Sequence, residues 1–383
     1  MYKRQILKLF ADYPFIPSFL DSGKEITDIV YDSRKARPDT IFVAMRGANR
    51  DGHDSCMNAY ENGCRDFVVE HRVTLPNDAI TYLVADSRRA LSVMSRSLFQ
   101  FTPKEEKKLV PTQLIAVTGT KGKTSTCMIL RSILEAAGRK VGYIGTLGVM
   151  YDGKVLETPN TTPESYEIFR HLRQMRLSGC EYVLIEASSQ GVKLHRTADL
   201  CFNLGVFTNL SPDHIGPGEH ESFEEYLACK RELFSQCALS IGNIDDEYYE
   251  QVVSNRFGRL TFGLSEKADY RAEDTAFTVS ADGFSTVFTC REKGKRHELK
   301  LKLPGMFSVY NALGAIAVAR NYGVSYETIQ AGLSTVRVKG RTEIVPDTGD
   351  VRVLLDYAHN ELSVKSLFDM LLLYNCLLYT SDA

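Results

Sequence analysis

The sequence contains no tryptophan, and none of its nine cysteines lies in a Cys-x-x-Cys pair. Zinc sites and dithiol redox sites use such pairs, so neither is expected here. We expect free thiols in a reducing compartment. No apolar run approaches the ~20 residues that a membrane helix requires. The N-terminus also lacks the apolar stretch and cleavage site of a signal peptide. These absences predict a soluble cytoplasmic protein without a membrane partner.

A strong excess of charge of either sign is also missing. The chain has 46 Lys+Arg and 48 Asp+Glu, a formal net charge of -2. A nucleic acid or an anionic membrane surface is therefore not an expected partner. With 383 residues, of which 44% are hydrophobic, the chain has room for two or three domains with sizeable cores.

The chain divides into three segments, and their pattern predicts an α/β fold. Residues 1–109 contain short apolar runs between turn residues, typical of a small α/β domain, and end in a polar linker at 102–108. Residues 110–336 alternate strands and helices, which indicates a central parallel sheet with right-handed crossovers. Residues 337–383 begin a third domain that we expect to be incomplete, with a foreign tail from about residue 374.

A β-rich patch is expected at residues 259–303, at the edge of the central domain. Two alternating runs flank Ala281, Asp282 and Gly283, which predicts a hairpin. The helix that follows is expected to end near Gly323, since glycine is common just after a helix end.

The strongest local signal is TGTKGKTS at 118–125, between an apolar strand at 114–117 and a helix at 124–137. Consecutive backbone N–H groups at a helix N-terminus attract phosphate oxygens. Lys123 can reach the terminal phosphates, and the Thr124 hydroxyl can bind Mg²⁺. The usual first glycine of a P-loop is replaced by Val117, with Gly119 inside the loop. By itself this predicts nucleotide binding, with an NTP-hydrolysing switch or a plain glycine turn as alternatives.

The variant loop TGTKGKTS resembles that of the Mur ligase family, the ATP-dependent amide-bond ligases of peptidoglycan synthesis. Other similar segments follow in the family's order, over about residues 6–373. They are YDSRKARPDTIFVAMRGANRDGHD (31–54), NTTPES (160–165), EASSQGVKLHR (186–196), FTNLSPDH (207–214), EEYLACKRELF (224–234), PGMFSVYNALGAI, KGRTE and DYAHN. The EASSQGVKLHR segment is similar to that of the members that add the third amino acid of the peptide.

The resemblance implies a three-domain architecture that binds a UDP-sugar at 1–109, ATP at 110–336 and an amino acid in the segment from 337. The implied reaction uses ATP to convert a carboxylate into an acyl phosphate, from which an amine displaces phosphate. L-lysine or meso-diaminopimelate would join UDP-MurNAc-L-Ala-D-Glu on a monomeric enzyme that needs Mg²⁺. The alternative is a binding-only fragment that holds ATP and the UDP-sugar without turnover.

The resemblance also implies roles for individual residues. The catalytic residues would be Lys123, Glu186, His214 and Lys230. The Mg²⁺ ligands would be Thr124, Glu186, His214 and Lys230, the last as a carbamate. ATP would contact Gly119, Thr120, Lys121, Gly122, Lys123, Thr124, Ser125, Asn311, Arg341 and Asp356. The UDP-sugar-peptide would contact Ser33, Arg34, Ala48, Asn49, Arg50, Asn160, Thr161, Thr162, Ser188 and Arg196.

Three positions depart from the family pattern. Gly216 stands where an acidic residue usually follows the loop histidine, Gln190 where a histidine follows the two serines, and Leu194 where a glutamine precedes the arginine.

Overall fold

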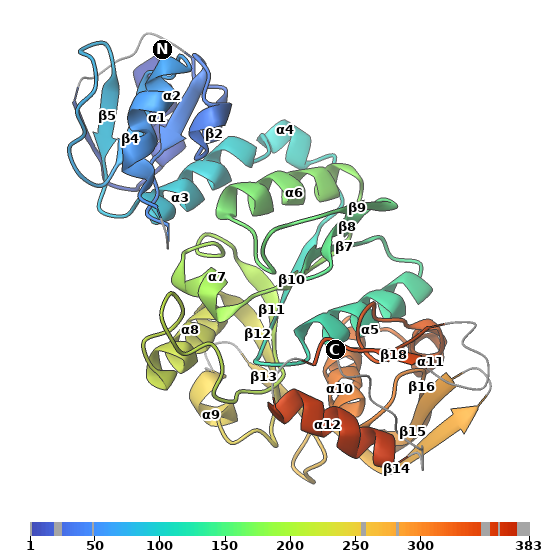
Figure 1. The fold of residues 1–383 in the computed structure, drawn as a ribbon. Coiled ribbons are helices and arrows are strands. Elements are labelled where there is room, and N and C mark those ends of the chain that lie inside the picture. The colour runs from blue at the N-terminus through green and yellow to red at the C-terminus, as the bar shows by residue number, and fades with distance from the viewer. Residues whose placement is uncertain are drawn as a thin grey trace.

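The computed structural model describes residues 2–18, 25–47, 50–253, 258–280, 283–345, 353–358 and 361–373. Two predicted substrate contacts, Ala48 and Asn49, and the tail at 374–383 lie outside these ranges. Within the described residues no helix has the length and apolar character needed to cross a membrane. Figure 1 shows an N-terminal sheet region, a larger central region, and the last elements beside the central helices.

The N-terminal region is a five-stranded sheet in the order β1-β5-β4-β3-β2, parallel except for β1. Its strands are β1 (Ile16–Pro17), β2 (Asp28–Val30), β3 (Thr40–Val43), β4 (Asp66–Val69) and β5 (Ile80–Leu83). Its helices are α1 (Tyr2–Phe10), η1 (Ser33–Lys35), η2 (Gly52–Ser55), α2 (Cys56–Glu61) and α3 (Ser87–Phe99). Every residue of β3 and β4 is buried, as expected for strands covered on both faces.

The central region is built on an eleven-stranded sheet in the order β16-β15-β14-β13-β12-β11-β6-β10-β7-β8-β9. Neighbours from β14 to β7 are parallel, and the pairs at both edges are antiparallel. The strands are β6 (Gln113–Thr118), β7 (Val141–Gly145), β8 (Gly148–Tyr151), β9 (Lys154–Leu156), β10 (Tyr182–Glu186), β11 (Phe202–Phe207), β12 (Cys237–Asn243), β13 (Arg259–Gly263), β14 (Tyr270–Ser280), β15 (Gly283–Glu292) and β16 (Lys295–Leu301). The α/β fold class with a central parallel sheet is thus confirmed.

Helices cover both faces of this sheet, which explains the nearly continuous apolar runs of its strands. Ile115 and Val117 of β6 pack into one core with α5 and α10, while Ala116 between them points into the opposite core. The helices are α5 (Lys123–Ala136), α6 (Ser165–Leu177), α7 (Ser189–Lys193), α8 (Phe223–Ser235), α9 (Tyr249–Val252), α10 (Met306–Asn321) and α11 (Tyr326–Thr335). The short helix α4 (Pro103–Glu106) precedes β6.

The β-rich edge predicted at 259–303 is confirmed, because β14 and β15 pair antiparallel with Ser280 opposite Gly283. The hairpin tip, Ala281 and Asp282, lies outside the described residues. Gly323 follows α10 with a φ of 78°, as expected for a C-terminal cap. The polar linker predicted at 102–108 contains the short helix α4, and its role between two domains stays a prediction. The helix α4 forms there because Thr102 and Glu105 make a reciprocal capping box.

The last described elements are β17 (Glu343–Val345), β18 (Val353–Leu355) and α12 (Glu361–Leu372). The two strands pair antiparallel. Met370 and Leu371 of α12 pack against Phe284 of β15, so this segment is docked on the edge hairpin of the central sheet. The predicted domain boundaries after residues 109 and 336 fall between α4 and β6 and between α11 and β17. They stay predictions.

Candidate active site

The phosphate loop connects β6 to α5 and contains two glycines with positive φ. Gly119 has a φ of 149° and Gly122 a φ of 89°. A Cβ atom would overlap the Thr208 hydroxyl at the first position and the Asn311 amide oxygen at the second. Glycine is therefore required twice, for its conformation and for the close approach of β11 and α10 to the loop.

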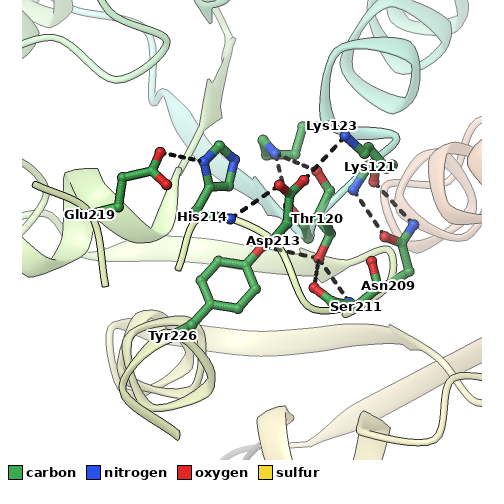
Figure 2. A network of polar contacts seen from close by, with 10 residues as sticks. Thr120, Lys121, Lys123, Asn209, Ser211, Asp213, His214, Glu219 and Tyr226 are labelled. Atoms are coloured by element: carbon green, nitrogen blue, oxygen red, sulfur yellow. Dashed lines mark hydrogen bonds and ion pairs between the residues drawn. The ribbon is translucent and has the colours of Figure 1, made fainter. Parts of the chain in front are cut away.

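Asn209, after β11, holds the first half of this loop (Figure 2). Its carbonyl accepts the Thr120 N–H at 2.8 Å, and its Oδ1 accepts the Lys121 N–H at 2.9 Å. The N–H groups of Thr120 and Lys121 therefore have acceptors within the protein, and the predicted ATP contacts of these two residues stay predictions. The first N–H groups of α5, at residues 123–125, have no acceptor within the helix. They are therefore open to an anion.

Lys123 closes the loop with its side chain. Its Nζ donates to the carbonyls of Gly119 at 2.8 Å and Thr120 at 3.1 Å. Burial lowers the pKa of this ammonium, and the Glu186 carboxylate opposes that shift. An anion bound beside this lysine would raise its pKa again, because the negative charge stabilises the ammonium form.

Glu186 ends β10 next to the loop, at the carboxyl edge of the parallel strands, and its side chain is fully buried. Its Oε2 accepts the Thr124 hydroxyl at 3.0 Å and the Thr146 hydroxyl at 3.1 Å. Its Oε1 accepts the Thr146 N–H at 3.3 Å and is in contact with the Tyr143 hydroxyl. Burial, and next the Glu186 charge, raise the pKa of Tyr143, so the phenol keeps its proton. A buried carboxylate beside a P-loop threonine is a suitable donor set for Mg²⁺.

His214 lies in the loop after β11 with a φ of 55° (Figure 2). Its Nδ1 is 3.0 Å from Glu219 Oε1, a carboxylate three residues after Gly216. The neighbouring Asp213 forms an ion pair with Lys121 at 3.2 Å. Partial burial raises the pKa of Asp213, but Lys121 and His214 together hold it below its usual value.

Lys230 on α8 is 1% exposed, and its Nζ lies 4.5 Å from the centre of the Tyr226 ring. Among the described residues its amine has no hydrogen-bond or ion-pair partner. Burial, followed by the charge of Lys123, lowers the pKa of Lys230 well below its usual value. The Tyr226 hydroxyl is 3.0 Å from Thr120 Oγ1, which fixes α8 against the phosphate loop.

Four predicted substrate contacts lie together beside Glu186. The Thr162 hydroxyl donates to the Glu186 carbonyl at 2.8 Å and is 3.0 Å from the Ser188 hydroxyl, which caps α7. Thr161 Oγ1 is 3.0 Å from Thr146 Oγ1. Arg196 donates to the Thr162 carbonyl at 3.0 Å, and its other nitrogens pair with Glu164. Asn160, just before them, is exposed.

The predicted uridine contacts are separate from this group. Arg34 is 85% exposed and pairs with Asp32 at 2.7 Å. It borders a cavity of about 350 Å³ between the N-terminal sheet and α6, together with Lys35, Arg37 and Arg170. Ser33 belongs to η1, and its carbonyl accepts the Asn62 amide at 3.0 Å. Arg50 is exposed.

Three predicted ATP contacts come from later segments. Asn311 of α10 is buried over Gly122, and its Oδ1 accepts the Thr126 hydroxyl at 3.4 Å. Arg341 stacks on Tyr357 at 4.9 Å, and its charge acts on Lys123. Asp356 accepts the N–H groups of Thr342 at 2.7 Å and Ala358 at 2.8 Å, so its carboxylate connects β18 with the segment before β17.

A second group of possible metal ligands occurs in the N-terminal region, where Asp51, His53 and His71 lie within 4.8 Å of one another. Both nitrogens of His53 already have partners, Asp51 Oδ1 at 2.5 Å and the Glu70 N–H at 2.9 Å. The His53 and His71 rings are stacked at 4.1 Å. While His53 keeps these two hydrogen bonds, neither of its nitrogens has a lone pair free for an ion.

Sequence reasoning missed Tyr143, Asn209 and Glu219, which contact the site through hydrogen bonds. Asn209 lies in the FTNLSPDH segment and Glu219 follows it. Their position as polar residues after a strand was the signal that could have identified them. Tyr143 lies inside a buried strand, and the sequence carries no signal that its hydroxyl reaches Glu186.

Comparison with known proteins shows the family. The sequence pattern described as the Mur ligase middle domain matches residues 117–319. The chain is 36% identical over 349 residues to the UDP-N-acetylmuramoyl-L-alanyl-D-glutamate--2,6-diaminopimelate ligase of Caldanaerobacter subterraneus, covering 91% of this chain and 70% of the relative. It is 37% identical over 361 residues to ligase 1 of the same name from Clostridium acetobutylicum, covering 93% and 72%.

Solved structures agree on the fold. A UDP-N-acetylmuramoyl-L-alanyl-D-glutamate--2,6-diaminopimelate ligase superposes with a TM-score of 0.74 at 23% identity, over 91% of this chain and 70% of that one. MurF from Acinetobacter baumannii superposes with a TM-score of 0.68 at 21% identity, over 98% and 77%. The glycine-built phosphate loop, the strand-end glutamate and these matches have one explanation: the chain belongs to the Mur ligase family and is a ligase that forms carbon–nitrogen bonds.

Proposed function

We propose that this protein uses ATP to join 2,6-diaminopimelate to UDP-MurNAc-L-Ala-D-Glu. The names of the relatives support this substrate pair and favour diaminopimelate over lysine. The observation that carries the ATP chemistry is the 3.0 Å hydrogen bond between Thr124 and Glu186, which places a buried carboxylate at the start of the phosphate-loop helix.

The residues fit Mg²⁺. Thr124 and Glu186 would hold it, together with His214 and a carbamate on Lys230, because these are oxygen and imidazole donors around one loop. When bound, Mg²⁺ would neutralise phosphate charge during transfer. Lys123 and the free amides of α5 would hold the phosphate oxygens from the other side.

The burial of the Lys230 amine supports the proposal of a carbamate on this residue. A buried lysine with a lowered pKa is partly neutral, and only the neutral amine attacks carbon dioxide. The new bond joins Nζ to the carbon, and the nitrogen loses one proton to solvent. The product is a carboxylate. It forms where the unmodified amine faces the Tyr226 ring and has no hydrogen-bond or ion-pair partner among the described residues.

The acceptor substrate, UDP-MurNAc-L-Ala-D-Glu, would extend from Arg196 to the cavity beside Arg34. Arg196 would pair with a carboxylate of the dipeptide through its planar fork. The cavity bordered by Arg34, Lys35, Arg37 and Arg170 would take the uridine diphosphate. Arg341 and Asp356 would close over ATP and keep water from the acyl phosphate before the amine attacks its carbonyl carbon and phosphate leaves.

The test is a reaction of the full chain with UDP-MurNAc-L-Ala-D-Glu, ATP, Mg²⁺ and diaminopimelate. Amine-dependent phosphate release and a product heavier by one diaminopimelate residue are expected, and lysine should replace diaminopimelate poorly. Phosphate release at the same rate with and without the UDP-sugar would contradict the proposal and favour an NTP-hydrolysing switch.

A binding-only fragment is the second candidate. It would use the phosphate loop and the cavity bordered by Arg34, both of which lie before residue 337. Saturable binding of ADP and the UDP-sugar-dipeptide without amine-dependent turnover would select this alternative.

A further inference from the structure

The two carboxylate oxygens of Glu186 have different kinds of partner. Oε1 meets the Tyr143 hydroxyl and the Thr146 backbone N–H. Oε2 meets the hydroxyls of Thr124 and Thr146. A backbone N–H cannot turn away from its acceptor, whereas a threonine hydroxyl can rotate its proton to another one.

The direction of the Tyr143 hydroxyl is also determined. Tyr143 is fully buried on β7, and Leu184, opposite it on β10, lies two residues before Glu186. The Leu147 N–H donates to the Tyr143 oxygen at 3.3 Å. Because the phenol accepts from Leu147, its single proton is available for Glu186. Gly145 leaves room for this contact, since a Cβ there would overlap both the tyrosine hydroxyl and Glu186 Oε1.

The partners of Oε2 can be exchanged. The Thr146 hydroxyl has an alternative partner in Thr161 Oγ1 at 3.0 Å. The Thr124 hydroxyl is itself a proposed ligand, so its proton would point away from a cation. Of the donors on Oε2, the Thr146 hydroxyl thus has another acceptor at hand, whereas the Thr146 N–H and the Tyr143 hydroxyl on Oε1 have no other acceptor among the described residues.

We infer that Tyr143 is a positioning residue that anchors Glu186 through Oε1, so that Oε2 alone is presented to the divalent cation. This inference rests on the proposed function, because it takes Glu186 as a cation ligand. It goes beyond the proposed function in two respects: it names the Glu186 oxygen that binds the cation, and it names a residue outside the ligand set that holds the Glu186 carboxylate in place. Hydrogen-bond partners of metal ligands typically change metal affinity by about 10–100-fold when removed.

The test is the affinity of the full chain for Mn²⁺ in the presence of ADP, measured by electron paramagnetic resonance. Tyr143→Phe should raise the Kd for Mn²⁺ about ten-fold and leave the Kd for ADP without metal unchanged. Thr146→Val removes a partner of Oε2 but keeps the backbone donor to Oε1, so it should leave the Kd for Mn²⁺ unchanged or lower it. This contrast separates an anchor on Oε1 from a general loss of hydrogen bonds.

Two controls keep the outcomes distinct. Tyr249→Phe removes another buried tyrosine hydroxyl, on α9, and should change neither Kd. Glu186→Gln tests the proposed function itself and should weaken Mn²⁺ binding more than Tyr143→Phe. An unchanged Kd in Tyr143→Phe with a weakened Glu186→Gln overturns the inference alone. An unchanged Kd in Glu186→Gln overturns the ligand role and the inference with it. If Tyr143→Phe does not fold, equal weakening in Thr146→Val and Glu186→Gln would overturn the assignment of Oε2.

Discussion

Arg196 and Glu164 form a largely buried ion pair in which Nη2 lies 2.8 Å and Nε 3.1 Å from the same carboxylate oxygen. Arg88 of α3 donates to the other oxygen of Glu164 at 3.0 Å. One carboxylate thus joins the N-terminal region to the loop that leads to α6. Any substrate carboxylate that binds Arg196 must share it with Glu164 or replace Glu164.

The first prediction concerns stability. Glu164→Ala should lower the free energy of unfolding by about 3 kcal/mol, because it leaves two largely buried guanidinium groups without their carboxylate. Denaturant unfolding measures this. Glu266→Ala, at an exposed ion pair with Arg271, is the matched control and should change stability by less than about 0.5 kcal/mol. Equal effects of the two substitutions would contradict the prediction.

The second prediction concerns substrate affinity. Glu164→Gln keeps the size of the side chain but removes the charge that competes for Arg196. The KM for UDP-MurNAc-L-Ala-D-Glu should therefore fall about five-fold, equivalent to about 1 kcal/mol. The KM for ATP should not change. A higher KM for the UDP-sugar would show that Glu164 assists binding and does not compete.

The third prediction concerns the carbamate. Lys230→Ala should lose most of the ligase activity, because the site would lack one oxygen ligand, and a small carboxylate such as acetate should restore part of it. Steady-state phosphate release with and without acetate measures both effects. Lys339→Ala, in the segment after α11, should show neither loss nor rescue. Full activity of Lys230→Ala without acetate would exclude the carbamate.

The fourth prediction concerns acid stability. Burial on α6 lowers the pKa of His171 to about 4, and its Nδ1 has no hydrogen-bond partner among the described residues. The unfolded chain, with an ordinary histidine pKa near 6.5, then binds more protons between about pH 4 and 6.5. Stability should fall as the pH drops through this window, by up to about 3 kcal/mol. His171→Leu should remove that part of the pH dependence, as measured by denaturant unfolding at pH 7, 5.5 and 4.5. An identical pH dependence in the variant would contradict this.

The fifth prediction separates backbone strain from a clash in the phosphate loop. Gly122→Ala forces a Cβ into Asn311 and should weaken ADP binding at least ten-fold, the equivalent of about 1.4 kcal/mol. Gly138→Ala, at the other end of α5, has a similar φ of 75° but open space around it. It should cost about 1–2 kcal/mol of stability and leave ADP affinity unchanged. Calorimetric titration with ADP distinguishes the two variants.

Much of the fold could be predicted because local signals agreed with one another. The strand before TGTKGKTS, the loop and the helix after it lie where the apolar runs and glycines indicated. The short helix α4 within the linker at 102–108 was not predicted, since a four-residue helix depends on one capping box that a polar composition hides. The roles assigned to individual site residues stay predictions.

The amino-acid sequence by itself determined the α/β class, the position of the phosphate loop and the family, because these depend on patterns that are local along the chain. Only the tertiary structure decided which polar groups meet. Tyr143 and Glu186 are 43 residues apart, and Arg88 and Glu164 are 76 apart. Such contacts depend on strand order and helix packing, which bring distant segments together and leave no periodic trace in the sequence.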